Sequence, residues 1–224
     1  MERWKGRVAL VTGASVGIGA AIARALVQHG MKVVGCARSV DKIEKLAAEC
    51  ESAGYVGTLV PYKCDVTSEE EILSMFSAIK TLHQGVDVCI NNAGLAHPEP
   101  LLSGRTEFWR NMIDVNVMAM CICTREAYQS MKERNIDDGH IININSVVGH
   151  VTYSDAIIHF YIATKCAVTA LTAGIHDELH DQKSHIRTTV LEAEDIASAV
   201  VYALGAPLHI AIGEIIIRPV EQIK

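Results

Sequence analysis

Tyr161 and Lys165 form the pair of residues in this sequence with the clearest capacity for acid–base chemistry. Their spacing of four places them on one face of a helix. A phenol has an unperturbed pKa of about 10, too high for ready proton exchange at neutral pH. A neighbouring ammonium favours the phenolate and so lowers that pKa. Such pairs also arise by chance in surface helices, so the surrounding motifs decide how the pair is interpreted.

A glycine-rich turn, Thr12-Gly13-Ala14-Ser15-Val16-Gly17-Ile18-Gly19, follows the apolar run Val8–Val11. Gly13 permits a sharp turn, Gly17 lets the backbone approach a diphosphate, and Gly19 lets the following helix pack close to the strand. The helix that begins here offers N–H groups and the positive end of its dipole to phosphates. A strand, this turn and a helix in succession predict a dinucleotide-binding site; a purely structural turn is the alternative.

The second strand is expected to end beside the adenosine ribose, about 20 residues beyond the last glycine. An acid there would hydrogen-bond a free 2′-hydroxyl, but the sequence has Ala37 and then Arg38. A guanidinium suits a 2′-phosphate in charge and in geometry. We therefore predict NADP(H) in preference to NAD(H). In the alternative interpretation Arg38 is a solvated charge and Asp41 binds a ribose, but Asp41 falls inside the next expected helix.

Two further polar segments follow expected strands. Asn91-Asn92-Ala93-Gly94 comes directly after one strand, and Ser146 closes Asn143–Ser146 after another. Ser146 stands far enough ahead of Tyr161 for the chain to return to the next helix. Ligands of open α/β sheets bind at the carboxyl ends of the strands. The spacing therefore predicts that these groups and Tyr161 meet at one edge of a sheet.

The elements that must position these groups alternate between short β-branched runs and longer segments of helical period. Strands are expected at 8–11, 32–36, 58–60, 86–90, 140–144 and 185–190, and helices at 20–26, 42–53, 69–82, 106–132 and 157–180. Ser68 and Glu71 have the spacing of a reciprocal capping box. This alternation predicts a single α/β domain over residues 1–224: a doubly wound parallel sheet with helices on both faces.

Taken together and in this order, these motifs resemble the short-chain dehydrogenase/reductase family. The shared features are TGxxxGIG, NNAG, an asparagine in the long helix, a serine at a strand end and YxxxK, and they cover nearly the whole chain. The resemblance implies a Rossmann-type fold. It also implies that the cofactor contacts Gly13, Ser15, Gly17, Ile18, Gly19, Arg38, Ser39, Asp65, Val66, Asn92, Ala93, Gly94, Tyr161 and Lys165.

The resemblance further implies roles in carbonyl reduction. Ser146 would hydrogen-bond the substrate carbonyl, Tyr161 would donate the proton, and Lys165 would lower the pKa of Tyr161 and hold the ribose. Asn116 would keep a water of a proton relay beside the lysine, and Asp65 would meet the adenine amino group. Asn92 would stabilise the sheet and border the cofactor. The stretch between Ser146 and Tyr161 is longer than usual, so its residues Val147, Tyr153 and His159 are expected to shape the substrate pocket.

The expected function is an NADPH-dependent reductase of ketones and aldehydes, with α-dicarbonyls and ketosteroids as substrates. The alternatives are an alcohol dehydrogenase of farnesol or retinol type working in the reverse direction, a non-catalytic NADP(H)-binding protein, and a methyltransferase that shares the glycine-rich first turn. A methyltransferase would need neither Arg38 nor the Tyr161–Lys165 pair. A homodimer or homotetramer is expected from the resemblance alone.

One departure from the family lies after Val190. Members of the family continue there with a Pro-Gly turn and a long substrate lid, whereas this chain passes at once into Leu191–Ile196, which resembles the helix that follows the lid. A segment of the length of that lid is therefore expected to be missing between 190 and 191. Either the printed sequence omits a lid, or the chain has a genuine deletion and binds cofactor and turns over poorly.

Composition narrows the setting. The chain has 224 residues and a net charge of −6, which makes nucleic acid and anionic membranes poor partners. No run approaches the ~18 apolar residues of a membrane span, and Val8–Val11 is too short for a signal-peptide core. The seven cysteines show no paired spacing, which is typical of reduced thiols and a cytoplasmic location. His176 and His180 lack the glutamate placement of a zinc hydrolase, so no metal site is expected.

Overall fold

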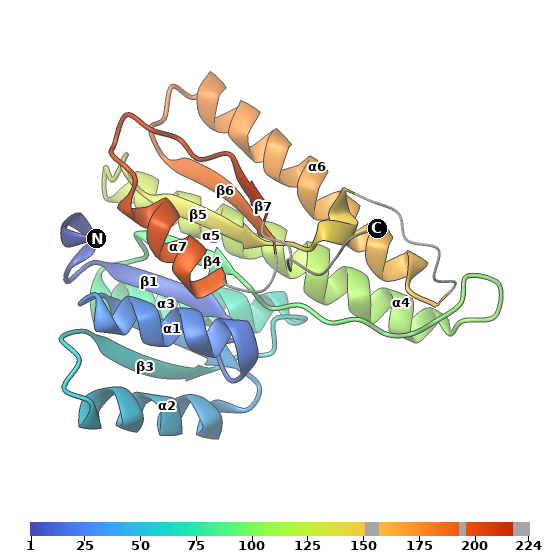
Figure 1. Ribbon diagram of the computed structural model, residues 1–224, viewed down its shortest axis with the longest axis horizontal. Helices are drawn as coiled ribbons and strands as arrows, with labels where there is room; N and C mark the ends of the chain where they lie inside the picture. The colour runs from blue at the N-terminus through green and yellow to red at the C-terminus, as the bar shows by residue number, and fades with distance from the viewer. Residues whose placement is uncertain (151–156, 193–195, 217–224) are drawn as a thin grey trace.

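The computed structural model describes residues 1–150, 157–192 and 196–216. Within them, parallel strands form one sheet in the order β3-β2-β1-β4-β5-β6-β7 (Figure 1). The strands are β1 (Val8–Thr12), β2 (Lys32–Ala37), β3 (Thr58–Lys63), β4 (Val88–Asn91), β5 (His140–Ile144), β6 (Arg187–Glu192) and β7 (Glu214–Ile216). The strand order reverses between β1 and β4, which creates a crevice at their carboxyl ends. The predicted doubly wound α/β fold is confirmed.

Helices cover both faces of this sheet (Figure 1). One face carries α1 (Gly17–Gln28), α2 (Val40–Ser52) and α7 (Ile196–Gly205), and the other carries α3 (Glu69–His83), α5 (Ala119–Glu133) and α6 (His159–Asp181). The short helix α4 (Thr106–Ile113) leads through the π-helical turn Asp114–Met118 into α5. It packs beside the first turns of α6, where the rings of Trp109 and Phe160 stack 5.5 Å apart. No helix in the described part of the chain is long and apolar enough to cross a membrane.

Burial on both faces explains why the strands are continuous apolar runs. All five residues of β1 are buried, with Ala9 and Val11 in the core beneath α1 and Val8 and Leu10 in the core beneath α3 and α5. Side chains of a strand point alternately to its two faces, so a strand covered twice needs apolar residues at every position. Each fully buried aliphatic side chain contributes roughly 1.5–3 kcal/mol.

A buried polar network joins the two central strands to two helices. Asn91 donates through Nδ2 to Thr124 Oγ1 on α5 (3.0 Å) and to Asn143 Oδ1 on β5 (2.8 Å). Asn143 donates in turn to Thr172 Oγ1 on α6 (2.9 Å). All four side chains are buried. Because these buried amides are hydrogen-bonded, the network links β4 and β5 to α5 and α6, and its hydrogen bonds offset the cost of burying polar groups.

The structure differs from the sequence-based prediction at three places. Strand β6 continues through Leu191 and Glu192, where the sequence predicted the start of a helix, and α7 begins only at Ile196; residues 193–195 lie outside the described residues. Strand β7 was not predicted, because three residues are too few to show a period. The long helix predicted over 106–132 is interrupted by a π-helical turn.

The capping box at the start of α3 is half formed. The Ser68 hydroxyl accepts from the Glu71 N–H (3.2 Å), as predicted. Glu71 Oε2, however, accepts from the backbone N–H of Asp65 (2.8 Å) rather than from that of Ser68. The glutamate therefore fixes the turn that follows β3 instead of closing the reciprocal pair.

Candidate active site

A cavity of about 410 Å³ opens at the carboxyl edge of the sheet. It lies at the crevice between β1 and β4, where the strand order reverses. Its walls come from the first turn of α1 and from the loops that follow β2, β3 and β4. The lining residues are Gly13, Ser15, Val16, Ile18, Gly19, Ala37, Arg38, Ser39, Cys64, Asp65, Val66, Asn92, Ala93, Gly94, Leu95 and Val115. Most of the residues predicted to bind the cofactor thus share one cavity.

The glycine-rich turn fits a dinucleotide diphosphate in its backbone. Gly13 and Gly17 have φ of +67° and +56°, values that other residues rarely adopt. A Cβ on Gly17 would meet nothing within 4 Å, so the turn is open to a ligand there. A Cβ on Gly19 would lie 2.3 Å from the Gly13 carbonyl oxygen, which shows how closely α1 approaches the turn. Helix α1 begins at Gly17 and presents its N-terminus to the cavity.

Thr12 and Asn92 lock this turn to the loop after β4. Asn92 Nδ2 donates to the Thr12 carbonyl (2.9 Å), and the N–H groups of Asn92 and Ala93 both donate to Thr12 Oγ1 (3.0 Å each). Asn92 lines the cavity at the sheet edge, and its place beside the cofactor stays a prediction. The part played by Thr12 was not foreseen from the sequence, where it stands only as the residue before Gly13.

At the far end of the cavity the walls carry charged groups. Arg38 follows β2, is exposed, and has no ion-pair partner among the described residues. The carboxylate of Asp65 is oriented by its own turn, since Oδ1 accepts from the N–H (3.0 Å) and hydroxyl (2.8 Å) of Thr67. Asp41 lies within α2 and does not line the cavity. An exposed guanidinium therefore lines this end of the cavity, and its contact with a ribose phosphate stays a prediction.

Ser146, Tyr161 and Lys165 come together beside this cavity. Ser146 follows β5 and caps the short helix Val147–Gly149. Tyr161 lies in the first turn of α6, and its hydroxyl is hydrogen-bonded to the Ser146 side chain. Lys165 is buried and donates through Nζ to the Ile144 carbonyl (3.1 Å). The predicted spacing of serine, tyrosine and lysine thus produces a spatial cluster.

The cluster is continuous with the cavity through Gly94. A Cβ built on Gly94 would lie 3.5 Å from Asn116 Oδ1 and 3.8 Å from Lys165 Nζ. Gly94 itself lines the cavity. A dinucleotide extending from the glycine-rich turn along the loop after β4 would therefore bring its far end to Lys165 and Tyr161.

The pKa of Tyr161 differs in direction from the sequence-based expectation. Burial raises the pKa of the phenol above its usual value, and the hydrogen bond from Ser146 offsets that only in part. The Lys165 ammonium lies 5.8 Å from the centroid of the Tyr161 ring. Lys165 is not among the causes of this shift, so the lowering of the Tyr161 pKa expected from the lysine is not seen in this structure.

Asn116 lies in the π-helical turn between α4 and α5 and is 3% exposed. Its Oδ1 accepts from the Leu95 N–H (2.8 Å), and its Nδ2 donates to the Leu95 carbonyl (2.8 Å) and to Thr164 Oγ1 (3.0 Å). π-helical turns inside α-helices occur frequently at functional sites. The sequence predicts Asn116 as part of the site but indicates neither the π-helical turn nor the contact with Thr164.

The predicted substrate-pocket residues are less well placed. Val147 begins the short helix after Ser146, and His159 begins α6. Neither lines the cavity at the carboxyl edge of the sheet, and Tyr153 lies outside the described residues. Their roles remain predictions.

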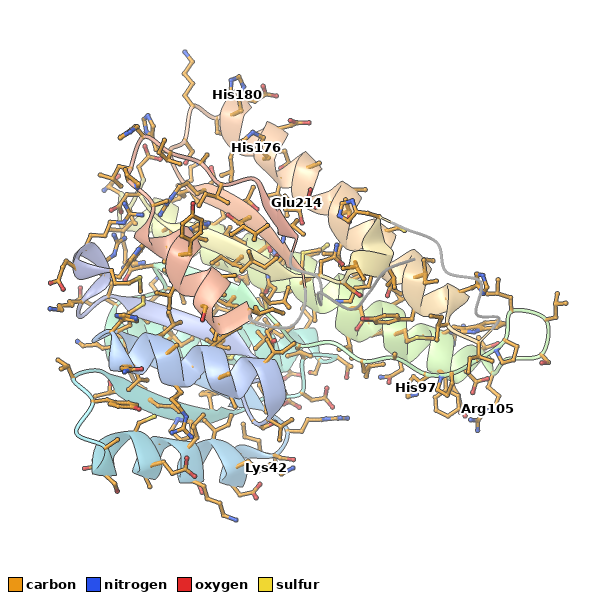
Figure 2. All side chains as sticks on the ribbon, in the orientation of Figure 1. Lys42, His97, Arg105, His176, His180 and Glu214 are labelled. Atoms are coloured by element: carbon orange, nitrogen blue, oxygen red, sulfur yellow. The ribbon has the colours of Figure 1, made fainter. Side chains whose placement is uncertain are left out.

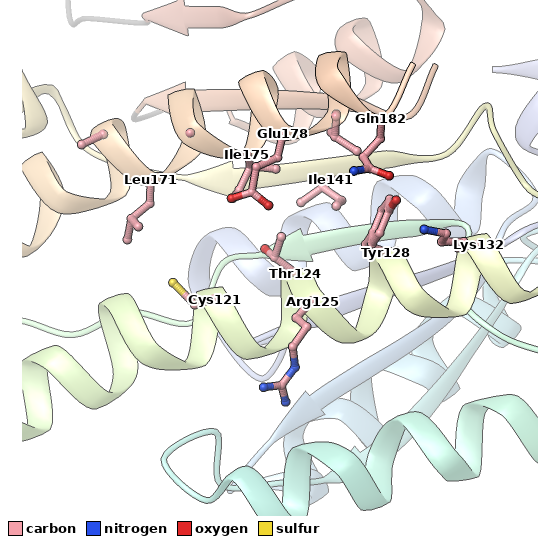
Figure 3. A pocket seen from close by; sticks show the side chains of 13 residues that line it. Cys121, Thr124, Arg125, Tyr128, Lys132, Ile141, Leu171, Ile175, Glu178 and Gln182 are labelled. Atoms are coloured by element: carbon pink, nitrogen blue, oxygen red, sulfur yellow. The ribbon is translucent and has the colours of Figure 1, made fainter. Parts of the chain in front are cut away.

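Other candidate sites lie away from this cluster. His176 and His180 are exposed on successive turns of α6 (Figure 2). Within the described ranges, no three His, Cys, Asp or Glu side chains are grouped so that they could hold a metal ion. A larger cavity of about 510 Å³ lies between α5 and α6, on the face of the sheet that α3, α5 and α6 cover (Figure 3). Tyr128 and Lys132 of α5 line one side of it, and Leu171 and Ile175 of α6 line the other.

Comparison with known proteins gives one consistent result. A family model described as short chain dehydrogenase matches residues 7–206. Dehydrogenase/reductase SDR family member 11 of Gallus gallus is 68% identical over 255 residues, covering 100% of both chains. Farnesol dehydrogenase of Aedes aegypti is 41% identical over 245 residues, covering 99% of each. A metagenomic short-chain oxidoreductase crystallised in complex with NADP is 31% identical, with a TM-score of 0.88, covering 98% of this chain and 99% of its own.

The alignment with the Gallus gallus relative also measures what this chain lacks. It spans 255 positions, whereas this chain has 224 residues, so at least 31 positions have no counterpart here. The absence of a segment of lid length after Val190 stays a prediction, and this difference in length supports it.

The site geometry and the comparisons point the same way. The cavity fits a dinucleotide, and the solved relative carries NADP. The serine, tyrosine and lysine cluster lies beside that cavity, next to Gly94 of its lining. Proteins of this family use a nicotinamide cofactor, and the family model covers nearly all of the sheet and its helices. This chain belongs to the short-chain dehydrogenase family.

Proposed function

We propose that this chain is an NADPH-dependent reductase that converts ketones or aldehydes to alcohols. The observation that carries the proposal is the meeting of Ser146, Tyr161 and Lys165 with a dinucleotide-sized cavity at one edge of the sheet. A hydroxyl donor and a phenol that share a hydrogen bond form a site for a carbonyl oxygen. The names of the relatives, a dehydrogenase/reductase and a farnesol dehydrogenase, support oxidoreductase chemistry of this kind.

Each residue of the site has its own role in the proposed reaction. The nicotinamide, when bound, supplies the hydride. Ser146 donates a hydrogen bond to the carbonyl oxygen of the substrate, and Tyr161 donates its phenolic proton to the same oxygen as negative charge develops there. Lys165 is placed to contact a ribose hydroxyl and to favour the tyrosinate that remains. Asn116 holds the loop after β4 through its hydrogen bond with Leu95. In this proposal it also holds a water that passes a new proton to Tyr161 after the reaction.

The experiment that tests this function follows NADPH oxidation by the purified chain. A small α-dicarbonyl and a ketosteroid are offered in parallel, and NADH replaces NADPH in a second series. Turnover with NADPH supports the reductase, and the faster substrate reports the size of the pocket. The absence of turnover with every carbonyl offered would contradict it.

Two observations favour alternative functions. The farnesol dehydrogenase relative favours alcohol oxidation, which the same assay tests when it is run with farnesol or retinol and NADP⁺. The absence of at least 31 positions from this chain favours a protein that binds NADP(H) without turnover. Tight NADPH binding by calorimetry with no turnover in either direction would support that second alternative.

The cofactor preference is proposed to rest on Arg38. Replacing it with aspartate removes a cation that suits a 2′-phosphate and adds a charge that repels it. We expect the R38D variant to bind NADPH about 100-fold more weakly, on the scale of a lost charge-assisted hydrogen bond, and to bind NADH no worse. Calorimetric titration with both cofactors measures this. K45D is the matched control, since Lys45 is exposed on α2 but does not line the cavity. An R38D variant that keeps the preference for NADPH would contradict the assignment.

A homodimer or homotetramer is proposed to form through the groove between α5 and α6. The groove is a hollow with apolar side chains from both helices, and Leu171 is 37% exposed on its rim (Figure 3). A second copy of the same two helices would fill it, as closed symmetric assemblies require. Burial of these apolar side chains would then be the main driving force for assembly.

Introducing a charge into this groove is therefore expected to dissociate the assembly. In L171E, burying the carboxylate against the partner would cost several kcal/mol. Sedimentation velocity should show the wild type as an oligomer and L171E as a monomer. L82E, which charges an exposed leucine on α3 outside the groove, should sediment like the wild type. A monomeric wild type, or an L171E oligomer, would contradict the proposed interface.

A cytoplasmic location is proposed from the cysteines. All seven are free thiols, and five of them are buried. A chain that leaves so many thiols unpaired suits a reducing compartment.

A further inference from the structure

We propose that the Thr164 hydroxyl is a positioning group, which fixes Asn116 against the helix that carries Tyr161 and Lys165. The inference rests on the proposed reductase function. Thr164 is thereby added to the four residues that the motifs indicate, which are Asn116, Ser146, Tyr161 and Lys165. Thr164 itself is assigned no contact with substrate or cofactor.

The first step concerns the Asn116 amide: both Nδ2 hydrogens and one of the two Oδ1 lone pairs are engaged by protein, and the second lone pair is left for the proposed water. The two Nδ2 hydrogens have one acceptor each, the Leu95 carbonyl (2.8 Å) and Thr164 Oγ1 (3.0 Å). Oδ1 accepts from the Leu95 N–H (2.8 Å). Exchanging the two ends of the amide would set Nδ2 against the Leu95 N–H, so this contact fixes its orientation. The side chain is therefore pinned between a loop and a helix.

The second step concerns Thr164, which is 1% exposed. Its Oγ1 accepts from Asn116 and donates to the Tyr161 carbonyl (2.7 Å), so both roles of the hydroxyl are used. Threonine makes such a bond to the preceding turn readily in a helix. One buried hydroxyl thus joins the π-helical turn to the first turns of α6. Valine would keep the shape but leave an Asn116 N–H without an acceptor.

The third step links this contact to the reaction centre. Leu95 is hydrogen-bonded to Asn116, and Val115 precedes Asn116 in the chain. Both line the cofactor cavity. Lys165 comes directly after Thr164, and its Nζ and Asn116 Oδ1 converge on the same side of Gly94. Loss of the hydroxyl would let the loop after β4 and the catalytic helix shift relative to each other. A shift of about 1 Å at a reacting centre can lower the rate by about 100-fold.

The test combines isosteric and conservative variants. In T164V we expect kcat to fall by about 10- to 100-fold with little change in the dissociation constant of NADPH, because the binding walls remain. T164S keeps the hydroxyl and should recover kcat to within about threefold. In an N116A background, T164V should lower kcat by less than about twofold, because the partner through which it acts is already gone.

Thr172 provides a matched control on the same helix. It is also buried, accepts from an asparagine (Asn143 Nδ2, 2.9 Å) and donates to a helix carbonyl (Val168, 2.7 Å). T172V makes the same chemical change two turns away, so it should lower thermal stability as T164V does but leave kcat within about twofold of the wild type. Equal losses of kcat in both variants would show a general effect on folding and overturn the inference.

The remaining outcomes separate this inference from the proposed function. If the wild type is active and T164V matches it, or if the T164V loss adds in full to that of N116A, the positioning role is wrong. If the wild type reduces no carbonyl, the proposed function fails, and NMR of the Asn116 side-chain amide decides the inference instead. One of the two Nδ2 protons should then exchange faster with solvent in T164V while the other stays protected. Unchanged exchange of both would overturn the link.

Discussion

Replacing Tyr161 with phenylalanine is expected to abolish carbonyl reduction while the protein still binds NADPH. The change removes one hydroxyl, whose hydrogen-bond partner is the Ser146 side chain, so the packing of the ring is kept. Without it, the developing alkoxide has Ser146 as a hydrogen-bond donor but no group placed to give up a proton. General acid catalysis contributes about 10²- to 10⁴-fold, and we expect kcat to fall by that range.

Steady-state NADPH oxidation measures kcat, and calorimetric titration measures whether the variant still binds NADPH. Y202F is the matched control, because Tyr202 is 68% exposed on α7, on the face opposite α6. It should retain the wild-type kcat. A Y161F variant with a tenth or more of the wild-type kcat would show that another group, or solvent, supplies the proton. Loss of NADPH binding in Y161F would instead assign the tyrosine mainly to the cofactor.

The parts of this site that the sequence revealed are those fixed by strand ends. Strand β1 leads into the glycine-rich turn, β4 into Asn92 and β5 into Ser146, and parallel strands bring their carboxyl ends to one edge. Helical spacing then aligned Tyr161 with Lys165. Such relations depend on local periods and on the direction of the chain, both of which are visible in sequence.

Other features depend on contacts between distant segments, and these were missed. The π-helical turn around Asn116 is held by Leu95 and Thr164, which lie 21 positions before it and 48 after it. The direction of the Tyr161 pKa follows from burial, which spacing from Lys165 does not reveal. Strand β7 exists because it pairs with the last residues of β6, from Val190 to Glu192. Tertiary surroundings determine all three, and no period in the sequence reports them.

Replacing Gly19 with alanine is expected to destabilise the fold and weaken cofactor binding together. The added Cβ would lie 2.3 Å from the Gly13 carbonyl oxygen and 2.4 Å from Asn92 Nδ2. The backbone cannot yield without separating α1 from the turn, and Asn92 cannot move without leaving its bonds to Thr12 and Gly13. We expect a loss of about 3 kcal/mol in the free energy of unfolding, at the upper end for overpacking. For a chain of this size that lowers Tm by roughly 6–12 °C.

The matched control tests whether G19A is destabilised by the contact of its Cβ with the turn or by any replacement of a helical glycine with alanine. Gly174 lies within α6, and a Cβ there would meet nothing within 4 Å. Gly174 lines the groove between α5 and α6, so the change is compared in the L171E background, where the proposed interface is absent. There G174A should raise the free energy of unfolding by about 0.5–1 kcal/mol, since alanine favours a helix over glycine. Calorimetric unfolding of both variants, with and without NADPH, gives the comparison. A G19A variant as stable as the wild type would mean that α1 can move away from the turn. NADPH binding should then fall more than stability does, because the proposed diphosphate site is at this turn.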